Sequence, residues 1–157
     1  MNHGEHSIDS SGEAWFLKQF NYQTSNQNLL FIDVGVNIGL STSEVIKYIN
    51  PPSTVHCFEP LSSNYEILVN KFNQDLRIKL NNLGLSKENQ DSEIYTVTRD
   101  SGMTSLYQRR LDHFGYVMKN TETVTLITLD EYCFNNKIDW IDYLKMDVEG
   151  HEYNVLK

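Results

Sequence analysis

Residues 29–39, LLFIDVGVNIG, carry the strongest structural signal in this chain of 157 residues. The first six are almost continuously apolar, which is typical of a strand buried on both faces of a parallel sheet. Gly35 and Gly39 then predict a turn. Ser41 and Glu44 have capping-box spacing and predict a helix directly after that turn. A buried strand that leads straight into a helix is the opening unit of an α/β fold.

The same unit recurs further along the chain. Thr54–Phe58 is a second apolar strand, Ser63 and Glu66 have the spacing of a helix cap, and residues 77–80 fit a third strand. Parallel strands joined through helices take right-handed crossovers. We therefore predict an α/β fold with a doubly wound, mainly parallel sheet.

The pattern changes in the second half of the chain. Residues 92–98 and 122–128 alternate, which predicts an antiparallel insertion rather than another crossover unit. Residues 128–132 predict a short capped helix, and residues 143–148 a fourth buried strand. We divide the chain into a lead-in with one helix, residues 1–28, and a partial α/β domain, residues 29–157.

The chain ends soon after the fourth strand, so the sheet is expected to be incomplete at the C-terminus. A strand edge without a neighbour has unpaired backbone groups and is prone to pair with another chain. The unfinished edge therefore favours self-association.

Composition excludes several classes of partner. Lys and Arg number 13 against 21 Asp and Glu, for a net charge of −8 without a basic cluster. Neither nucleic acid nor an anionic membrane is therefore expected as the main partner. No apolar run approaches the roughly 20 residues that span a bilayer. Residues 1–9 lack the features of a signal peptide, so we expect a cytoplasmic protein.

The two cysteines, Cys57 and Cys133, are expected to be buried, inert thiols.

Three carboxylates stand at the ends of predicted parallel strands: Asp33, Glu59 and Asp147. Because ligands bind outside the carboxyl ends of such strands, we expect the three side chains to face one crevice. Asp33 would repel a pyrophosphate but suits an ammonium group, and Glu59 stands where an acidic residue accepts hydrogen bonds from ribose hydroxyls. The glycine spacing departs from the dinucleotide fingerprint, which disfavours a nicotinamide-dependent oxidoreductase.

The segment after the fourth predicted strand, DVEGHE at residues 147–152, allows more than one interpretation. Its carboxylates and histidine suit a general base, or a hard-cation site with Asp147 and Glu149 as the first ligands to test. The alternative is structural: Glu149 and Glu152 form a favourable acidic first helical turn, and His151 faces solvent. We prefer the structural interpretation for His151 and Glu152, the functional one for Asp147, and predict no metal.

Four motifs, in this order and spacing, resemble the FkbM-type methyltransferases: residues 33–39, 58–60, 128–132 and 144–150. Residues 81–86 are similar to that family's segment after the third strand, and residues 101–106 to its serine-containing loop. The resemblance covers the chain from Leu29 to its end, and four ordered motifs are far more specific than any one of them.

The resemblance implies a Rossmann-like fold of the class I methyltransferase type. It also implies S-adenosylmethionine as cofactor and methyl transfer to a hydroxyl oxygen of a small molecule or sugar. Cofactor-binding residues implied by position are Asp33, Gly35, Asn37 and Gly39 for the methionine end, Glu59 for the ribose, and Leu85 and Ser86 for the adenine. Catalytic candidates are Asp147, Glu149 and His151, which would border the methyl-transfer site and remove the acceptor's proton.

Members of this family continue beyond the 144–150 motif, so the resemblance implies a C-terminally truncated member. The alternative function is a degenerate S-adenosylmethionine-binding module, or an inactive fragment, that does not turn over. The sequence does not identify the methyl acceptor.

Overall fold

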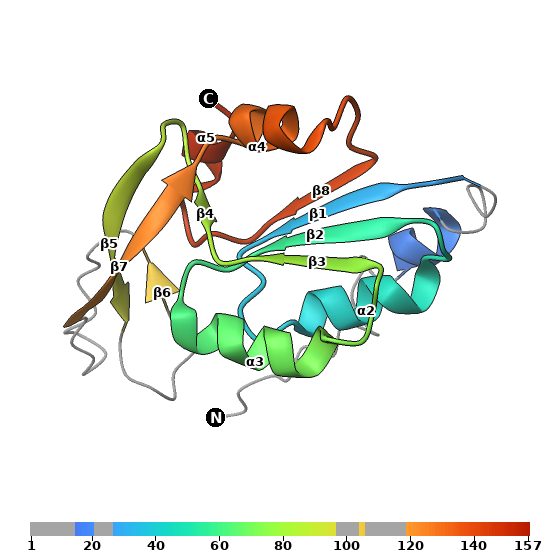
Figure 1. The fold of residues 1–157 in the computed structure, drawn as a ribbon, viewed down its shortest axis with the longest axis horizontal. Coiled ribbons are helices and arrows are strands. Elements are labelled where there is room, and N and C mark those ends of the chain that lie inside the picture. Colours follow the sequence, from blue (N-terminus) through green and yellow to red (C-terminus); the bar gives the residue numbers. More distant parts are fainter. Residues whose placement is uncertain (1–14, 21–26, 97–103, 106–118) are drawn as a thin grey trace.

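The computed structural model of the protein describes residues 15–20, 27–96, 104–105 and 119–157 (Figure 1). Residues 15–20 are helical and belong to the predicted N-terminal helix, whose earlier residues lie outside the described part. The elements that follow are, in chain order, β1 (Leu30–Val34), α2 (Leu40–Tyr48), β2 (Thr54–Phe58), α3 (Ser62–Phe72), β3 (Ile78–Asn81), β4 (Gly84–Leu85), β5 (Gln90–Thr96), β6 (Thr104–Ser105), β7 (Lys119–Ile127), α4 (Leu129–Asn136), β8 (Tyr143–Met146) and α5 (Glu152–Val155).

The main sheet has four parallel strands in the order β3-β2-β1-β8. Figure 1 shows α2 and α3 below this sheet and α4 and α5 above it, so the predicted doubly wound arrangement is confirmed. β1 lies inside the sheet, with Phe31, Ile32 and Val34 almost fully buried. This burial explains its nearly continuous apolar sequence, because both faces of the strand are covered.

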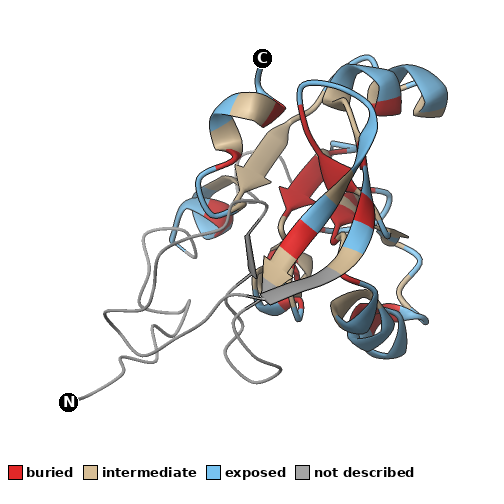
Figure 2. Cartoon of the chain, turned by 90° about the vertical axis from the view of Figure 1, so that its left-hand side faces the viewer, coloured by how far each residue is buried: buried red, intermediate tan, exposed pale blue. Residues whose placement is uncertain are grey.

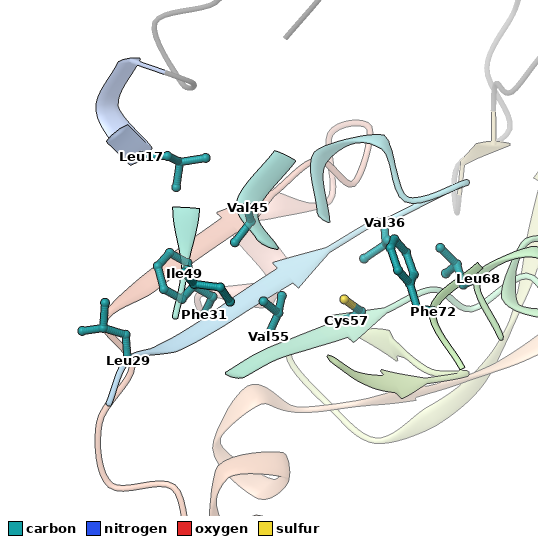
Figure 3. Close-up of a cluster of buried hydrophobic side chains, with 10 residues drawn as sticks. All are labelled: Leu17, Leu29, Phe31, Val36, Val45, Ile49, Val55, Cys57, Leu68 and Phe72. Atoms are coloured by element: carbon teal, nitrogen blue, oxygen red, sulfur yellow. The ribbon is translucent and has the colours of Figure 1, made fainter. Parts of the chain in front are cut away.

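Side chains of β1 and β2 alternate between two cores. Phe31 and Val55 pack with Val45 of α2 and Leu68 of α3 on one face (Figure 3). On the other face, the cluster of buried residues consists of Ile32, Val34, Phe58, Leu85, Tyr132 and Val155. The period of two along each strand therefore assigns the two helix layers to opposite faces.

A second, four-stranded sheet has the order β4-β7-β5-β6 and lies beyond the carboxyl ends of the main strands (Figure 1). β5 and β7 are antiparallel, which confirms the predicted insertion, while the short β4 pairs with β7 in parallel. Ile94 of β5 and Leu126 of β7 are buried with Leu61 at the start of α3. Burial along the two strands of this hairpin follows the same alternation (Figure 2). Of the predicted loop at residues 101–106, the structure describes only Thr104 and Ser105, in β6.

Two predicted helix caps are wrong. α2 begins after Gly39 and α3 after Leu61, and neither N-cap residue makes a side-chain capping bond. Ser41 lies inside α2, because the glycine turn itself leads into the helix. The Glu122 carboxylate of β7 instead accepts a hydrogen bond from the backbone N–H of Ser62 (2.9 Å), a contact between elements that local spacing does not reveal.

Three further predictions concern the cap of α4, the burial of β8 and the two cysteines. Thr128 is the N-cap of α4 and accepts from the Glu131 N–H, as predicted. β8 is half-buried rather than buried, because among the described residues only β1 pairs with it. Cys57 is buried as expected, but Cys133 is half-buried on α4.

Candidate functional site

A cavity of about 110 Å³ lies between the carboxyl ends of β1, β2 and β8 and the β5–β7 hairpin. Its position is the one expected for ligands in open α/β sheets. The predicted site residues in its lining are Gly35, Asn37, Glu59, Leu85, Asp147, Glu149 and His151. Phe58, Ile94 and Leu126 add an apolar wall. Residues that the sequence separates by more than 100 positions thus meet around one hollow.

Glu59 is the buried carboxylate of this cavity, with 4% of its surface exposed. Its Oε2 accepts from the Asn37 N–H (2.8 Å) and its Oε1 from the Leu61 N–H (3.0 Å). Burial raises the pKa of Glu59, and these hydrogen bonds oppose the rise because they stabilise the charged form. A carboxylate offers about four lone-pair sites, so these bonds leave acceptor capacity toward the cavity.

The glycine turn between β1 and α2 is shaped first by the chain's own packing. Gly35 has a φ of 79°, and a Cβ there would lie 2.1 Å from the carbonyl oxygen of Asp147. Gly39 has a φ of 77°, and its Cβ would lie 2.6 Å from the Phe72 ring. Gly39 therefore serves contact between α2 and α3 and does not line the cavity. Close approach of a ligand at Gly35 and Asn37 stays a prediction.

Asp33 lies behind the turn rather than in the cavity. It is 2% exposed, and its Oδ2 accepts from the Thr42 hydroxyl (2.8 Å). Burial raises the pKa of Asp33, opposed by Lys145, whose Nζ lies 3.7 Å from Oδ1. Of the three carboxylates expected to converge, the structure brings together Glu59 and Asp147, and Asp33 supports the strand ends from the α2 face.

The opposite side of the cavity is a turn with solvated carboxylates. Asp147 and Glu149 are both exposed, and Glu149 has a φ of 55°, an uncommon value for a residue other than glycine. The turn is held by the Glu152 carboxylate, which accepts from the backbone N–H groups of Val148 (3.1 Å) and Gly150 (3.3 Å). The backbone N–H of Glu152 itself, and then the N–H groups of Gly150 and Val148, lower the pKa of this carboxylate. Glu152 is thus structural, as predicted, and stands in the first turn of α5, but it also holds the preceding turn, and Glu149 lies outside the helix.

The expectation that His151 faces solvent is wrong. His151 is 7% exposed, and its Nε2 lies 3.1 Å from the hydroxyl of Ser86, which is 2% exposed. Its Nδ1 lies 3.3 Å from Nδ2 of Asn154. Burial lowers the pKa of His151, which favours the neutral ring. Ser86, predicted near an adenine, is in contact with His151 and does not line the cavity, a pairing over 65 positions that no local pattern indicates.

Two supporting residues on α3 escaped the sequence analysis. Asn64 donates from Nδ2 to Oδ1 of Asn37 (3.2 Å) and to Oε1 of Glu59 (3.4 Å). Lys71 Nζ donates to the carbonyl oxygens of Ile38 (3.1 Å) and Gly39 (2.9 Å). The position of Asn64, five residues after Glu59 and in the predicted helix, was the one available signal.

The described residues also bear on metal binding and on membrane insertion. Within them, no three or more His, Cys, Asp or Glu side chains are grouped as a metal site. The helices of that same part of the chain include none with the length and apolarity needed to cross a membrane.

Comparison with protein-family models matches residues 33–157 to the methyltransferase FkbM domain. Neither the curated proteins nor the solved structures give a match. The matched region begins at Asp33 and includes the glycine turn, Glu59 and the Asp147–His151 segment, and thus every residue that lines the cavity. Because the match covers most of the chain, this protein belongs to the FkbM methyltransferase family.

Proposed function

We propose that the chain binds S-adenosylmethionine in the cavity at the carboxyl ends of β1, β2 and β8 and supports transfer of its methyl group to a hydroxyl oxygen of a small molecule or sugar. The observation that carries the proposal is the shared lining of Glu59, Asp147 and Glu149 in a chain of the FkbM methyltransferase family. These residues combine one buried carboxylate with two solvated ones.

The residues present fit the chemical groups of this cofactor. Glu59 already accepts three hydrogen bonds, so one lone-pair site of its carboxylate, on Oε2, is left for a ribose hydroxyl. Phe58, Ile94 and Leu126 offer an apolar wall for a flat ring. Asp147 and Glu149 supply negative charge that suits an ammonium or sulfonium group. The enclosed volume of about 110 Å³ is below the roughly 300 Å³ of a typical whole-ligand pocket, so a ligand of this size would extend past the rim.

When bound, the cofactor supplies an electrophilic methyl group on a positively charged sulfur. The protein's contribution is then to hold an acceptor hydroxyl in line with that methyl group and to exclude competing water. A hydroxyl acceptor must also lose its proton, and a carboxylate or imidazole within hydrogen-bond reach can accept it.

Among the three candidates for that proton, the carboxylates of Asp147 and Glu149 are the stronger. Both are exposed at the rim, where an acceptor can reach them. The two ring nitrogens of His151 already face Ser86 and Asn154, so His151 must break one of these contacts before it can take a proton. We propose that His151 fixes the position of the turn and that Asp147 or Glu149 receives the proton.

The test is ligand binding followed by turnover. S-adenosylmethionine or its demethylated product should raise the melting temperature, and Glu59→Ala should reduce that rise. Glu66→Ala, a change at an exposed position of α3, is the matched control and should bind like the unmodified protein. A folded sample whose melting temperature does not respond to either ligand would contradict the proposal.

A panel of sugars and other hydroxyl compounds then separates an enzyme from a binding module. Transfer of a labelled methyl group to any member, abolished by Glu59→Ala, supports catalysis. Binding of the cofactor without transfer to any member of the panel supports the alternative, a module that keeps the cofactor site and does not turn over.

A further inference from the structure

Asn64 lies in the first turn of α3 and links two parts of the candidate cofactor site. Its Nδ2 donates to Oδ1 of Asn37 in the glycine turn (3.2 Å) and to Oε1 of Glu59 after β2 (3.4 Å). Asn37 in turn donates its backbone N–H to the other oxygen of Glu59 (2.8 Å). Asn64, Asn37 and Glu59 therefore form a closed ring of hydrogen bonds. Asn64 itself does not line the cavity, so it acts through the other two.

The direction of these bonds is fixed by the partners. The carboxylate of Glu59 can only accept when ionised, so Asn64 turns its amide nitrogen toward it, and the Asn37 amide then faces that nitrogen with its oxygen. Rotating the Asn64 amide by 180° would set its oxygen against a carboxylate oxygen, a repulsive contact. The network thus assigns the amide nitrogen to this side.

This ring of hydrogen bonds restrains two groups, the strained backbone of Asn37 and the charged carboxylate of Glu59. Asn37 has a φ of 53°, in the left-handed region, and its side chain is held by Asn64. The Glu59 carboxylate is almost fully buried, where a charged group is costly unless donors surround it. Among the described residues, the donors to this carboxylate are the side-chain amide of Asn64 and the backbone N–H groups of Asn37 and Leu61.

We propose that Asn64 is a positioning residue for the cofactor site, whose amide ties the Glu59 carboxylate to the glycine turn and presets both for a ligand with a ribose hydroxyl. This inference rests on the proposed function, because only the proposed cofactor supplies the ribose hydroxyl that Glu59 would bind. It adds a residue outside the cavity whose loss weakens binding without removing any contact to the ligand.

Two variants separate this role from simple packing. Asn64→Asp keeps the shape of the side chain but replaces the donor by a carboxylate 3.4 Å from Glu59. Asn64→Ala removes the donor and adds no charge. At pH 8, Asn64→Ala should bind S-adenosylhomocysteine about threefold to tenfold more weakly than the unmodified protein, and Asn64→Asp more weakly still. A packing role predicts the opposite order, because the isosteric Asp fills the same space.

Asn70→Asp is the matched control, since Asn70 is exposed on the same helix and the change adds the same charge. It should bind like the unmodified protein. Calorimetry gives the affinities, and circular dichroism with the melting temperature of each free variant establishes that it is folded.

The pH profile of binding supplies a second readout. An ionised Glu59 accepts from hydroxyls, so affinity should fall as the pH falls through the pKa of Glu59. Loss of the Asn64 donor raises that pKa, and the acid limb of Asn64→Ala should shift to higher pH. An unshifted limb, or an Asp variant that binds as well as the unmodified protein, overturns the inference. Failure of the unmodified protein to bind would instead overturn the proposed function.

Discussion

The two sides of the cavity differ in how they hold their carboxylates. On the β1–β2 side, Glu59 is almost fully buried and bonded to backbone and side-chain donors. On the β8 side, Asp147 and Glu149 are exposed on a turn after the strand. One side is therefore built before any ligand arrives, and the other remains in contact with water.

This difference separates two physical tasks. A buried, pre-oriented carboxylate can select hydroxyl groups by geometry, because water no longer competes for it. A solvated carboxylate attracts a cation over a longer distance and can exchange protons with solvent, but each such charge contributes little. The buried side should therefore respond to pH and to the loss of single donors, and the exposed side to salt.

The largest loss of stability is expected from a substitution at the point where the two sides of the cavity are in contact. Gly35→Ala would place a methyl group 2.1 Å from the Asp147 carbonyl oxygen, and the φ of 79° adds backbone strain. Overpacking costs about 1–3 kcal/mol and the left-handed conformation about 1–2 kcal/mol, so the free energy of unfolding should fall by about 2–5 kcal/mol. Urea denaturation measures this loss.

Gly150→Ala controls for the backbone term alone. Gly150 also has a positive φ, 98°, but it is exposed. Its substitution should cost only about 1–2 kcal/mol. Equal losses at both glycines would mean that the two sides are not in the close contact that the structure gives them.

The next largest loss of stability is expected from the contact between Ser86 and His151, which holds the turn on the exposed side. Ser86→Ala removes the hydroxyl partner of His151 in a buried setting and should lower the unfolding free energy by about 1–3 kcal/mol. His151→Phe removes the other partner and fills a similar volume. A double-mutant cycle should return a coupling energy of about 1 kcal/mol. Strict additivity would show that the pair does not hold the β8 turn.

The main sheet was predictable because its signals are local. A buried parallel strand has its own apolar run, as residues 29–34 do, and β1 was found within one residue of its observed start. The antiparallel hairpin was equally accessible from its alternation. The Thr128 cap was predicted because the two residues that form it, Thr128 and Glu131, are only three positions apart.

The features that were not predicted depend on contacts between segments that are distant in the sequence. The Ser41 and Ser63 caps failed because a glycine turn and Glu122 of β7 serve those helix ends instead. His151 was expected in solvent because its local sequence is polar, and only the fold brings Ser86 to it. Asp33 was given a ligand role from its strand end, yet side chains alternate along a strand, and Asp33 points to the α2 face with Thr42.

A smaller change in stability is expected from the burial of His56 near the β1–β2 side of the cavity. This burial should make the free energy of unfolding depend on pH. His56 of β2 contacts the Tyr132 hydroxyl (3.1 Å), and burial together with Lys79 lowers its pKa from 6.5 to about 4. The unfolded chain therefore binds the proton first, and stability should fall as the pH drops from about 6.5 to 4. Because His56 is only partly buried, the loss should be about 1–2 kcal/mol after solvent screening.

His56→Gln is the reference for this measurement. Asp33 and Glu59 have raised pKa values, so their contribution has the opposite sign and weakens as the pH rises above about 4. The difference between the unmodified protein and His56→Gln, measured by urea denaturation at each pH, isolates the histidine. A difference that does not change between pH 6.5 and 4 would contradict the assigned environment.

The smallest effect is expected on the exposed side. Asp147→Asn removes one solvated charge from the rim without changing its shape, and an exposed ion pair is worth little. Affinity for S-adenosylmethionine should fall by about twofold to threefold at low salt. S-adenosylhomocysteine lacks the sulfonium charge, so its affinity should fall less if Asp147 lies near that group.

Salt then separates the two sides. Raising the ionic strength from about 0.01 M to 1 M shortens the Debye length from about 30 Å to 3 Å, which screens an exposed charge and leaves a buried hydrogen bond almost unchanged. The difference between Asp147→Asn and the unmodified protein should therefore disappear at high salt, while the deficit of Asn64→Ala should persist. If the Asp147 deficit persisted as well, Asp147 would make a direct, desolvated contact with the ligand, and the exposed side would close when the ligand binds.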